Sequence, residues 1–207
     1  MNKWQPLMAE TTQLTVYHQD LFPTRVWTVD LGALASYRSR WIDIIKQMQS
    51  NNPNPAGRSN RLGWNSEPTL FNDQRFAPLA EAASGVVDLI FKEMGPPDFP
   101  NTLEAWANVH GLSGYNTIHN HAGALLSACY YLSVPPNSGA LVLRDPRPGA
   151  MLSPWQGSLR PNGGSEIAIT PQQGQLIVFP NWLEHGAEAH AGSEARISIP
   201  INVVLKR

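Results

Sequence analysis

Three histidines are spaced in a way that could bind a metal ion. His119 and His121 flank a single residue in the segment YNTIHNHAG. In an extended backbone, residues i and i+2 point to the same face, so both imidazoles can reach one ion. His185, just after the apolar run QLIVFPNW, is the candidate for a third ligand. Histidines in a bare H-x-H pair are also found as surface or hydrogen-bonded residues, so this motif alone leaves both interpretations open.

A charge and a hydroxyl share one face of the last apolar segment. In RISIPINVVL, Arg196, Ser198 and Asn202 fall on one face of an extended chain, and isoleucine and valine residues fall on the other. If the apolar face packs in the core, Arg196 projects into the interior, where an unpaired guanidinium is costly unless an anion meets it. A ligand carboxylate could form a bidentate pair with it. The alternative is an ion pair with a nearby glutamate: Glu184, Glu188 or Glu194.

The elements that position these residues are predicted to be two helices followed by many short strands. Residues 13–29 predict an opening strand, a turn at Phe22-Pro23 and a further extended piece. Apolar residues recur at helical spacing in 31–48 and again in 75–94, where Gly95-Pro96-Pro97 should end the helix. After Pro100 the period becomes two, which predicts strands in 103–111, 125–134, 139–145, 165–171, 174–180 and 195–205.

This pattern predicts a mainly β (α+β) fold with one domain over residues 1–207. Residues 1–100 should supply an N-terminal strand and helical support, and residues 101–207 most of a jelly roll or closed barrel. The two N-terminal helices are expected to pack on one sheet. The open mouth of such a barrel is a usual place for a ligand site.

Composition excludes several classes of partner. A net charge of -1 and a pI near 6.6 give no basic field for nucleic acid or an anionic membrane. No run approaches the roughly 18 apolar residues of a membrane span. The single cysteine, Cys129, lies in an apolar run and cannot form an internal disulfide. We therefore expect a cytoplasmic protein that binds neither nucleic acid nor a membrane.

In this arrangement, the residues resemble those of the Fe(II)- and 2-oxoglutarate-dependent oxygenases, which share a double-stranded β-helix. In that superfamily an H-x-D/E pair and a later histidine hold the iron, and an arginine, often in R-x-S, grips the far carboxylate of 2-oxoglutarate. The chain has residues at the corresponding positions in the same order: His119, His121, His185 and Arg196-Ile197-Ser198. The segments WANV, HNHAGALLSACYYL, LRDPRP, FPNWLEHG and RISIPIN resemble those of a family of small 2-oxoglutarate oxygenases, over roughly residues 104–203.

The resemblance implies a cofactor set and a reaction class. Fe(II) would be the metal, 2-oxoglutarate the cosubstrate and O2 the oxidant, with succinate and CO2 as co-products. The expected reaction is hydroxylation of an unactivated C–H bond of a small-molecule or peptidyl substrate, which would make the protein an oxidoreductase of the dioxygenase type. The chemistry of such a centre belongs to the cofactor, while the protein binds and orients the reactants.

One departure from the family pattern leaves alternatives open. His121 stands where the acidic ligand is expected, which leaves the site with one more positive charge than usual. His121-Ala122-Gly123 also resembles the H-x-G of iron halogenases, although His119 would then have no role. Asp145 could supply an acid from a distance, although its Asp-Pro sequence favours a turn. Two further alternatives are a cupin-like three-histidine enzyme without 2-oxoglutarate and a non-catalytic jelly roll.

Other residues are assigned roles around the cosubstrate and the mouth. By resemblance to the second tyrosine of YYL in prolyl hydroxylases, the Tyr131 hydroxyl would help Arg196 hold 2-oxoglutarate, and a core tyrosine is the alternative. Asn108 could bond the cosubstrate, the substrate or the protein itself. Ser198 is placed with Arg196 on the cosubstrate side. The mouth is expected to carry a polar and aromatic set: Trp106, Trp155, Trp182 and Arg147.

Overall fold

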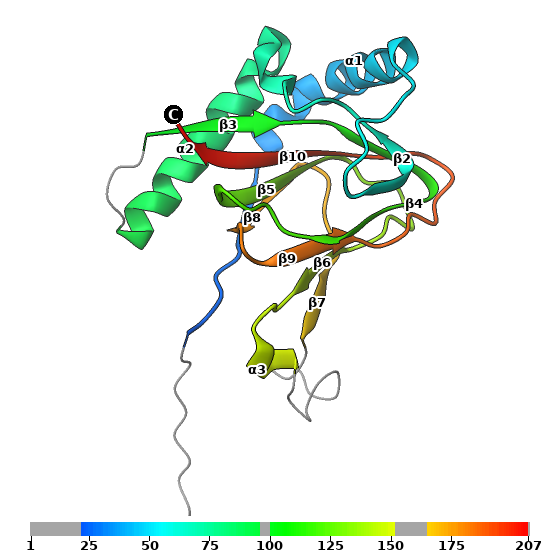
Figure 1. Cartoon of the computed structure of the whole chain (residues 1–207). Coiled ribbons are helices and arrows are strands. Elements are labelled where there is room, and N and C mark those ends of the chain that lie inside the picture. Colours follow the sequence, from blue (N-terminus) through cyan, green and yellow to red (C-terminus); the bar gives the residue numbers. More distant parts are fainter. Residues whose placement is uncertain (1–21, 96–99, 152–164, 207) are drawn as a thin grey trace, which may run out of the picture.

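The computed structural model describes residues 22–95, 100–151 and 165–206 (Figure 1). In chain order the elements are β1 (Trp27–Asp30), the 3₁₀ helix η1 (Gly32–Tyr37), α1 (Arg38–Asn51), β2 (Asn60–Asn65), the 3₁₀ helices η2 (Leu70–Asn72) and η3 (Gln74–Phe76), α2 (Ala77–Met94), β3 (Asn101–Ala105), β4 (Asn108–His119), β5 (Ala124–Ser133), β6 (Leu141–Arg144), α3 (Pro148–Met151), β7 (Glu166–Ile169), β8 (Gln175–Pro180), β9 (Glu184–Ala187) and β10 (Arg196–Leu205).

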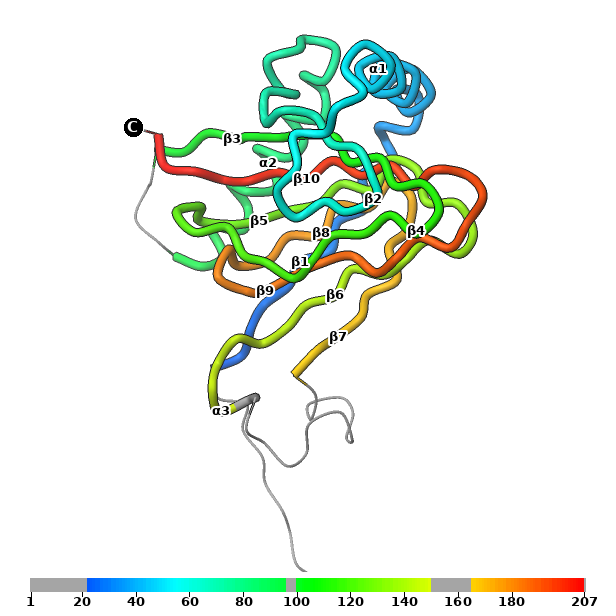
Figure 2. The backbone as a smooth tube through the Cα atoms, turned by 45° about the vertical axis from the view of Figure 1, so that its right-hand side comes forward, coloured from blue at the N-terminus to red at the C-terminus, as the bar shows by residue number. Residues whose placement is uncertain are grey.

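The strands form one curled antiparallel sheet, which Figure 2 shows as a half-barrel. Their order is β1-β8-β5-β10-β4-β9-β6-β7, and β2 and β3 pair with β4 and β10 respectively. The long strand β4 pairs with β10 near its start, through Asn108 and His110, and with β9 at its end, through His119. The mainly β, jelly-roll architecture with two helices is confirmed.

The two long helices cover one face of the sheet, as Figures 1 and 2 both show. Trp41 and Ile45 of α1 and Leu79 of α2 lie in the same hydrophobic cluster as Tyr130 of β5 and Ile199 of β10. All five side chains have no exposed surface, so the helices and the sheet share one core. The first predicted helix differs in detail, because residues 32–37 form a 3₁₀ turn and the α-helix begins at Arg38.

The last strand separates an apolar face from a polar one. Ile197, Ile199, Ile201 and Val203 lie in the core shared with the helices. Arg196 and Ser198 point to the other face, where they line a cavity inside the half-barrel. Because successive side chains of a strand alternate, the burial of the isoleucines forces the guanidinium into the interior.

Two strands of the sheet are absent from the sequence prediction, and one predicted strand is divided. The structure adds β2 and β9, and it splits the predicted strand 103–111 into β3 and β4. The division falls at Trp106 and Ala107, where Trp106 N donates to Pro200 O and Ala107 N donates to Ser66 Oγ. Pro200 has no N–H, so the ladder to β10 is interrupted there.

Some sequence predictions fall on parts of the chain that the structure does not describe. Residues 13–21 of the predicted opening strand and Trp155 of the predicted mouth lie outside the described residues. Among the described residues, no helix combines the length and the apolar character that crossing a membrane requires.

Candidate metal centre

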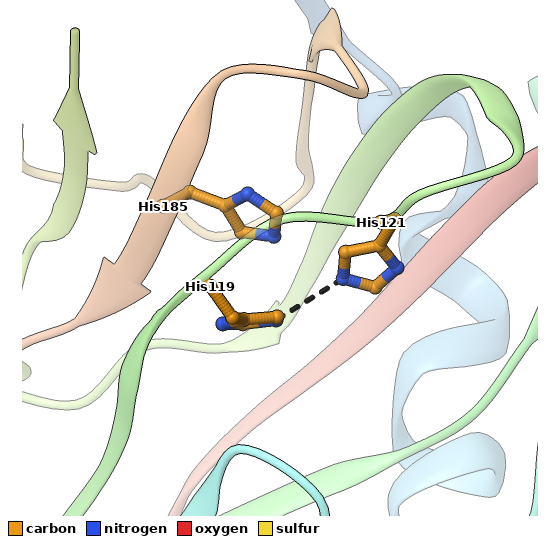
Figure 3. A group of neighbouring side chains, drawn as sticks. All are labelled: His119, His121 and His185. Carbon is orange, nitrogen blue, oxygen red and sulfur yellow. Dashed lines mark hydrogen bonds between the residues drawn. The ribbon is translucent and has the colours of Figure 1, made fainter. Parts of the chain in front are cut away.

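Three imidazoles converge at one point of the half-barrel (Figure 3). One nitrogen from each of His119, His121 and His185 lies within 4.8 Å of those of the other two. His119 and His121 approach most closely, with 3.1 Å between their Nε2 atoms. His185 comes from the neighbouring strand, and its ring centroid is 4.4 Å from that of His119. Three neutral imidazole nitrogens at this spacing form a donor set that suits Fe, Zn, Cu or Ni ions.

Different local structures bring the histidines together. His119 is the last residue of β4 and pairs with His185 of β9. His121 lies beyond the strand end, in the turn to β5, where its carbonyl accepts from Ala124 N and from Asn181 Nδ2. Strand β9 approaches β4 closely beside His185, since a Cβ on Gly186 would lie 2.8 Å from Asn116 O. A larger residue at that position would push the β9 histidine away.

Backbone hydrogen bonds fix two of the rings with their Nε2 atoms directed at the common point. His119 Nδ1 donates to Thr117 O at 2.8 Å, and His185 Nδ1 donates to Leu183 O at 3.0 Å. A ring that donates from Nδ1 carries its lone pair on Nε2, which is the tautomer that can bind a metal. The 3.1 Å contact between the Nε2 atoms of His119 and His121 therefore has one proton, on His121. A cation bound at this point would require the other neutral tautomer of His121, with the proton on Nδ1.

The environment keeps these imidazoles neutral. Burial, together with the nearby His119, lowers the pKa of His185 to about 3. Burial lowers the pKa of His121 to about 4, assisted by the charges of His119 and Arg58 and opposed by a hydrogen bond with Asn202. Burial also lowers the pKa of His119. Metal binding needs neutral rings, so the three residues have the required charge state at neutral pH.

The histidines stand between an open groove and a narrow inner cavity. The groove, of about 1100 Å³, passes Arg58, Glu104, Trp106, Asn120 and Lys206. The inner cavity, of about 60 Å³, is lined by the histidines and by a second set of residues that includes Asn108, Tyr131, Phe179, Arg196 and Ser198. A metal at the histidines would therefore face the narrow inner cavity on one side and the open groove on the other.

The Arg196 guanidinium, which lines the inner cavity, has no carboxylate partner among the described residues. Arg196 is 2 % exposed, Nη1 donates to Gly139 O at 2.7 Å, and Nη2 donates to His110 Nδ1 at 2.7 Å. Its Nε is buried without an acceptor. None of the three glutamates proposed as partners forms an ion pair with Arg196: Glu184 approaches Arg144, the Glu188 carboxylate accepts from Ala140 N, and Glu194 is exposed. Burial lowers the pKa of Arg196, and a guanidinium stays charged nonetheless.

The remaining residues assigned to the cosubstrate lie in the same cavity. Ser198 is the cross-strand neighbour of both Asn108 and Tyr131. The Asn108 Oδ1 atom is buried without a hydrogen-bond partner in the described part of the chain. Burial raises the pKa of Tyr131 well above its ordinary value, and its hydroxyl neighbours Cys129. Each of these groups can donate to or accept from a bound ligand.

The mouth differs in part from the sequence prediction. Trp106 lines both spaces and stacks on the His121 ring at a centroid distance of 5.6 Å. Trp182 is exposed but lines neither space, and Arg147 bonds Asp145 and the carbonyl of Phe22. Asp145 is therefore paired on the surface and is not part of the histidine cluster.

Sequence reasoning missed three contributors: Arg58, Ser59 and His110. Ser59 Oγ lies 3.3 Å from His119 Nε2, and Arg58 stands on the groove wall, close enough for its charge to lower the pKa of His121. Arg58 and Ser59 lie between the two predicted helices, in a segment rich in Asn, Pro and Ser that gave no sign of a site. His110 carried no pattern that distinguished it from a core histidine.

Comparison with known proteins finds a similar family. Residues 104–202 match the family model described as "Putative 2OG-Fe(II) oxygenase". This part of the chain is similar to members of that family. The matched residues include the three histidines and Arg196, which supports Fe(II) and 2-oxoglutarate as the cofactors of the enzyme. No curated protein sequence matches the chain.

Solved structures of oxygenases have the same fold. A Pseudomonas putida prolyl-4-hydroxylase is similar with a TM-score of 0.63 and 13% identity, covering 89% of this chain and 94% of that one. The epimerase SnoN from nogalamycin biosynthesis, in complex with Fe3+, alpha ketoglutarate and nogalamycin RO, has a TM-score of 0.64 and 16% identity over 87% and 79% of the two chains. HygX from Streptomyces hygroscopicus, with nickel and 2-oxoglutarate bound, has a TM-score of 0.61 and 11% identity over 88% and 84%. At these identities the likeness establishes the fold.

Proposed function

We propose that this 2-oxoglutarate oxygenase hydroxylates a C–H bond of a small molecule or a peptide side chain, with iron held by His119, His121 and His185. The observation that carries the proposal is one inner cavity that joins three converging imidazoles to a buried guanidinium, which has no carboxylate partner in the part of the chain that the structure describes. Bound Fe(II), with 2-oxoglutarate and O2, supplies the oxidising chemistry and yields succinate and CO2. The chain itself binds, orients and shields the reactants.

The donor set fits iron, although it differs from the usual two histidines and one carboxylate. Imidazole is a suitable ligand for iron, and two of the three rings are oriented by backbone carbonyls. For His121 to bind through Nε2, the ring must carry its proton on Nδ1 instead, where the Asn202 side chain, which hydrogen-bonds this ring, can accept it. Three neutral ligands leave the full metal charge to attract a dianionic cosubstrate.

Arg196 would bind the far carboxylate of 2-oxoglutarate. Two of its five N–H groups are used by protein acceptors, which leaves three for a carboxylate. A buried guanidinium without a counter-ion is costly, so a ligand anion in this cavity removes an unfavourable term. Ser198, Tyr131 and Asn108 are the neutral hydrogen-bonding groups that would complete the cosubstrate site.

The outer groove would hold the substrate. It adjoins His119 and His121, and Trp106 forms an aromatic wall beside His121. Its lining is mixed, with charged Arg58, Glu104 and Lys206 among several amides. A groove of this character suits a polar substrate, and enzymes of the same fold include one solved with nogalamycin RO and a prolyl hydroxylase solved with a peptide fragment.

The arrangement supports this function over the halogenase alternative. A halogenase site built on His121 and Gly123 would leave His119 without a role, whereas the His119 ring lies among the other two. A cupin-like enzyme without a cosubstrate would leave Arg196 to the substrate alone, yet this guanidinium lines the narrow inner cavity and is absent from the groove lining.

Metal analysis and cosubstrate turnover test the proposal. Protein loaded with Fe(II) without O2 should hold one iron per chain, bind 2-oxoglutarate and, after exposure to O2, form succinate. His185→Ala should lose the iron, because two imidazoles remain. Retention of one iron by His119→Ala and His185→Ala alike, or absence of both 2-oxoglutarate binding and succinate from the iron-loaded wild type, would reject the assignment.

A further inference from the structure

His110 is the side chain that contacts the buried guanidinium most directly from the sheet. It faces Arg196 as its cross-strand partner in the pairing of β4 with β10. Arg196 Nη2 lies 2.7 Å from His110 Nδ1, and the His110 side chain has no exposed surface. The contact joins residues 86 positions apart in the chain.

The chemistry of this contact defines the protonation of the ring. A guanidinium only donates hydrogen bonds, so His110 Nδ1 must accept with its lone pair, and the proton of the neutral ring lies on Nε2. Burial, together with the charges of Arg196 and His190, lowers the pKa of His110 to about 3. The Arg196 Nη2 atom therefore donates to a neutral acceptor, the His110 ring.

The fold makes a specific space for the imidazole. A Cβ on Gly63 of the adjacent strand β2 would lie 2.5 Å from His110 Cδ2 and 2.7 Å from Asn60 Oδ1. Only glycine leaves that position open to the ring. The second acceptor of Arg196, Gly139 O, is also neutral, so both protein partners of the guanidinium leave its charge uncompensated.

We propose that His110 is a positioning residue that orients Arg196 without neutralising it, so that the charge is preserved for the far carboxylate of 2-oxoglutarate. This inference rests on the proposed function of Arg196. A carboxylate at position 110 would satisfy the buried guanidinium permanently and would compete with the cosubstrate for it. A neutral imidazole fixes the direction of the fork and leaves the remaining N–H groups to the ligand. The inference gives a histidine outside the metal centre a part in cosubstrate affinity.

Three substitutions separate orientation from charge. His110→Asn places an amide oxygen near the position of Nδ1 and keeps a neutral acceptor. The aspartate of His110→Asp is nearly the same size as the asparagine but adds a negative charge. His110→Phe keeps a ring without an acceptor. The affinity of each Fe(II)-loaded protein for 2-oxoglutarate is measured by anaerobic calorimetry, with iron stoichiometry and the apparent melting temperature measured on the same samples.

We expect His110→Asn to bind 2-oxoglutarate within about threefold of the wild type, and His110→Asp and His110→Phe to bind it about tenfold or more weakly. His110→Asp should melt no lower than His110→Asn, because its carboxylate pairs with the buried guanidinium. If His110 had a merely structural role, the affinity for 2-oxoglutarate would follow the melting temperature, and His110→Asp would bind it at least as tightly as His110→Asn. Iron stoichiometry should be unchanged in all three.

Two results overturn the inference while leaving the proposed function intact: wild-type affinity in His110→Asp, or equal losses in His110→Asn and His110→Phe. Failure of the wild-type protein itself to bind 2-oxoglutarate would instead reject the proposed function, and this inference with it.

Discussion

Replacing Arg196 by glutamine should remove most of the affinity for 2-oxoglutarate. The guanidinium is 2 % exposed and lacks a carboxylate partner among the described residues, so a ligand carboxylate would meet it without competition from water or protein. Hydrogen bonds that involve a charged group contribute about 1.5–3 kcal/mol each. A bidentate pair therefore contributes about 3–6 kcal/mol, which corresponds to a loss of at least about 100-fold in affinity.

Anaerobic calorimetry of the Fe(II)-loaded protein measures this loss directly. Arg144→Gln is the matched control, because Arg144 pairs with Glu166 at the surface, its side chain is 34% exposed, and it lines neither cavity. The control should bind 2-oxoglutarate as the wild type does. Arg196→Lys should be intermediate, since an ammonium keeps the charge but not the planar fork. A loss of less than tenfold in Arg196→Gln, with iron still bound, would refute the assigned role of this residue.

Three further predictions address the support of the site. Gly63→Ala should lower the free energy of unfolding by about 1–3 kcal/mol, seen as a lower midpoint in urea, because its Cβ would lie 2.5 Å from His110 Cδ2. The control Gly85→Ala, in open space on α2, should not destabilise the protein. Equal stability of the two variants would contradict the close packing at Gly63. The pKa of His110 is about 3 when folded against about 6.5 when unfolded, so its contribution to stability is present above pH 6.5 and is lost as pH falls toward 3. The wild type should lose about 2–3 kcal/mol by pH 4.5 from this residue, and His110→Asn should lose correspondingly less in urea titrations; parallel pH curves would count against a buried neutral ring. His121→Asp should still bind Fe(II) but bind 2-oxoglutarate about tenfold more weakly in calorimetry, because a carboxylate removes one positive charge beside a dianion; tighter binding would contradict the charge argument.

Periodicity predicted the parts of the fold in which one face of an element is apolar. The helix with Leu79, Ala83 and Ile90 on one side and the strand with Ile197 and Ile199 on one side were recognisable because burial imposes their periods. By contrast, β2 has the sequence NRLGWN, in which Leu62 adopts a φ of +53° and the register to β4 shifts around it. Such a bulge removes the alternation on which strand prediction depends.

The candidate site was predictable to the extent that its residues are close in the sequence or have a strand period. The grouping of His119 with His121 followed from spacing, but the structural reason differs, because the strand ends at His119 and a turn carries His121. The pairing of His110 with Arg196 depends on the register of two distant strands, which the local sequence does not encode. The division into support over 1–100 and core over 101–207 stays a prediction, although β1 and β2 join the same sheet.

The most direct test is a crystal structure of the protein loaded with Fe(II) and 2-oxoglutarate in the absence of O2. The account predicts a metal bound by nitrogens of His119, His121 and His185, with the far carboxylate of 2-oxoglutarate on Arg196. A metal held by other residues, a His121 ring turned away from it, or a cosubstrate that does not contact Arg196 would contradict the account.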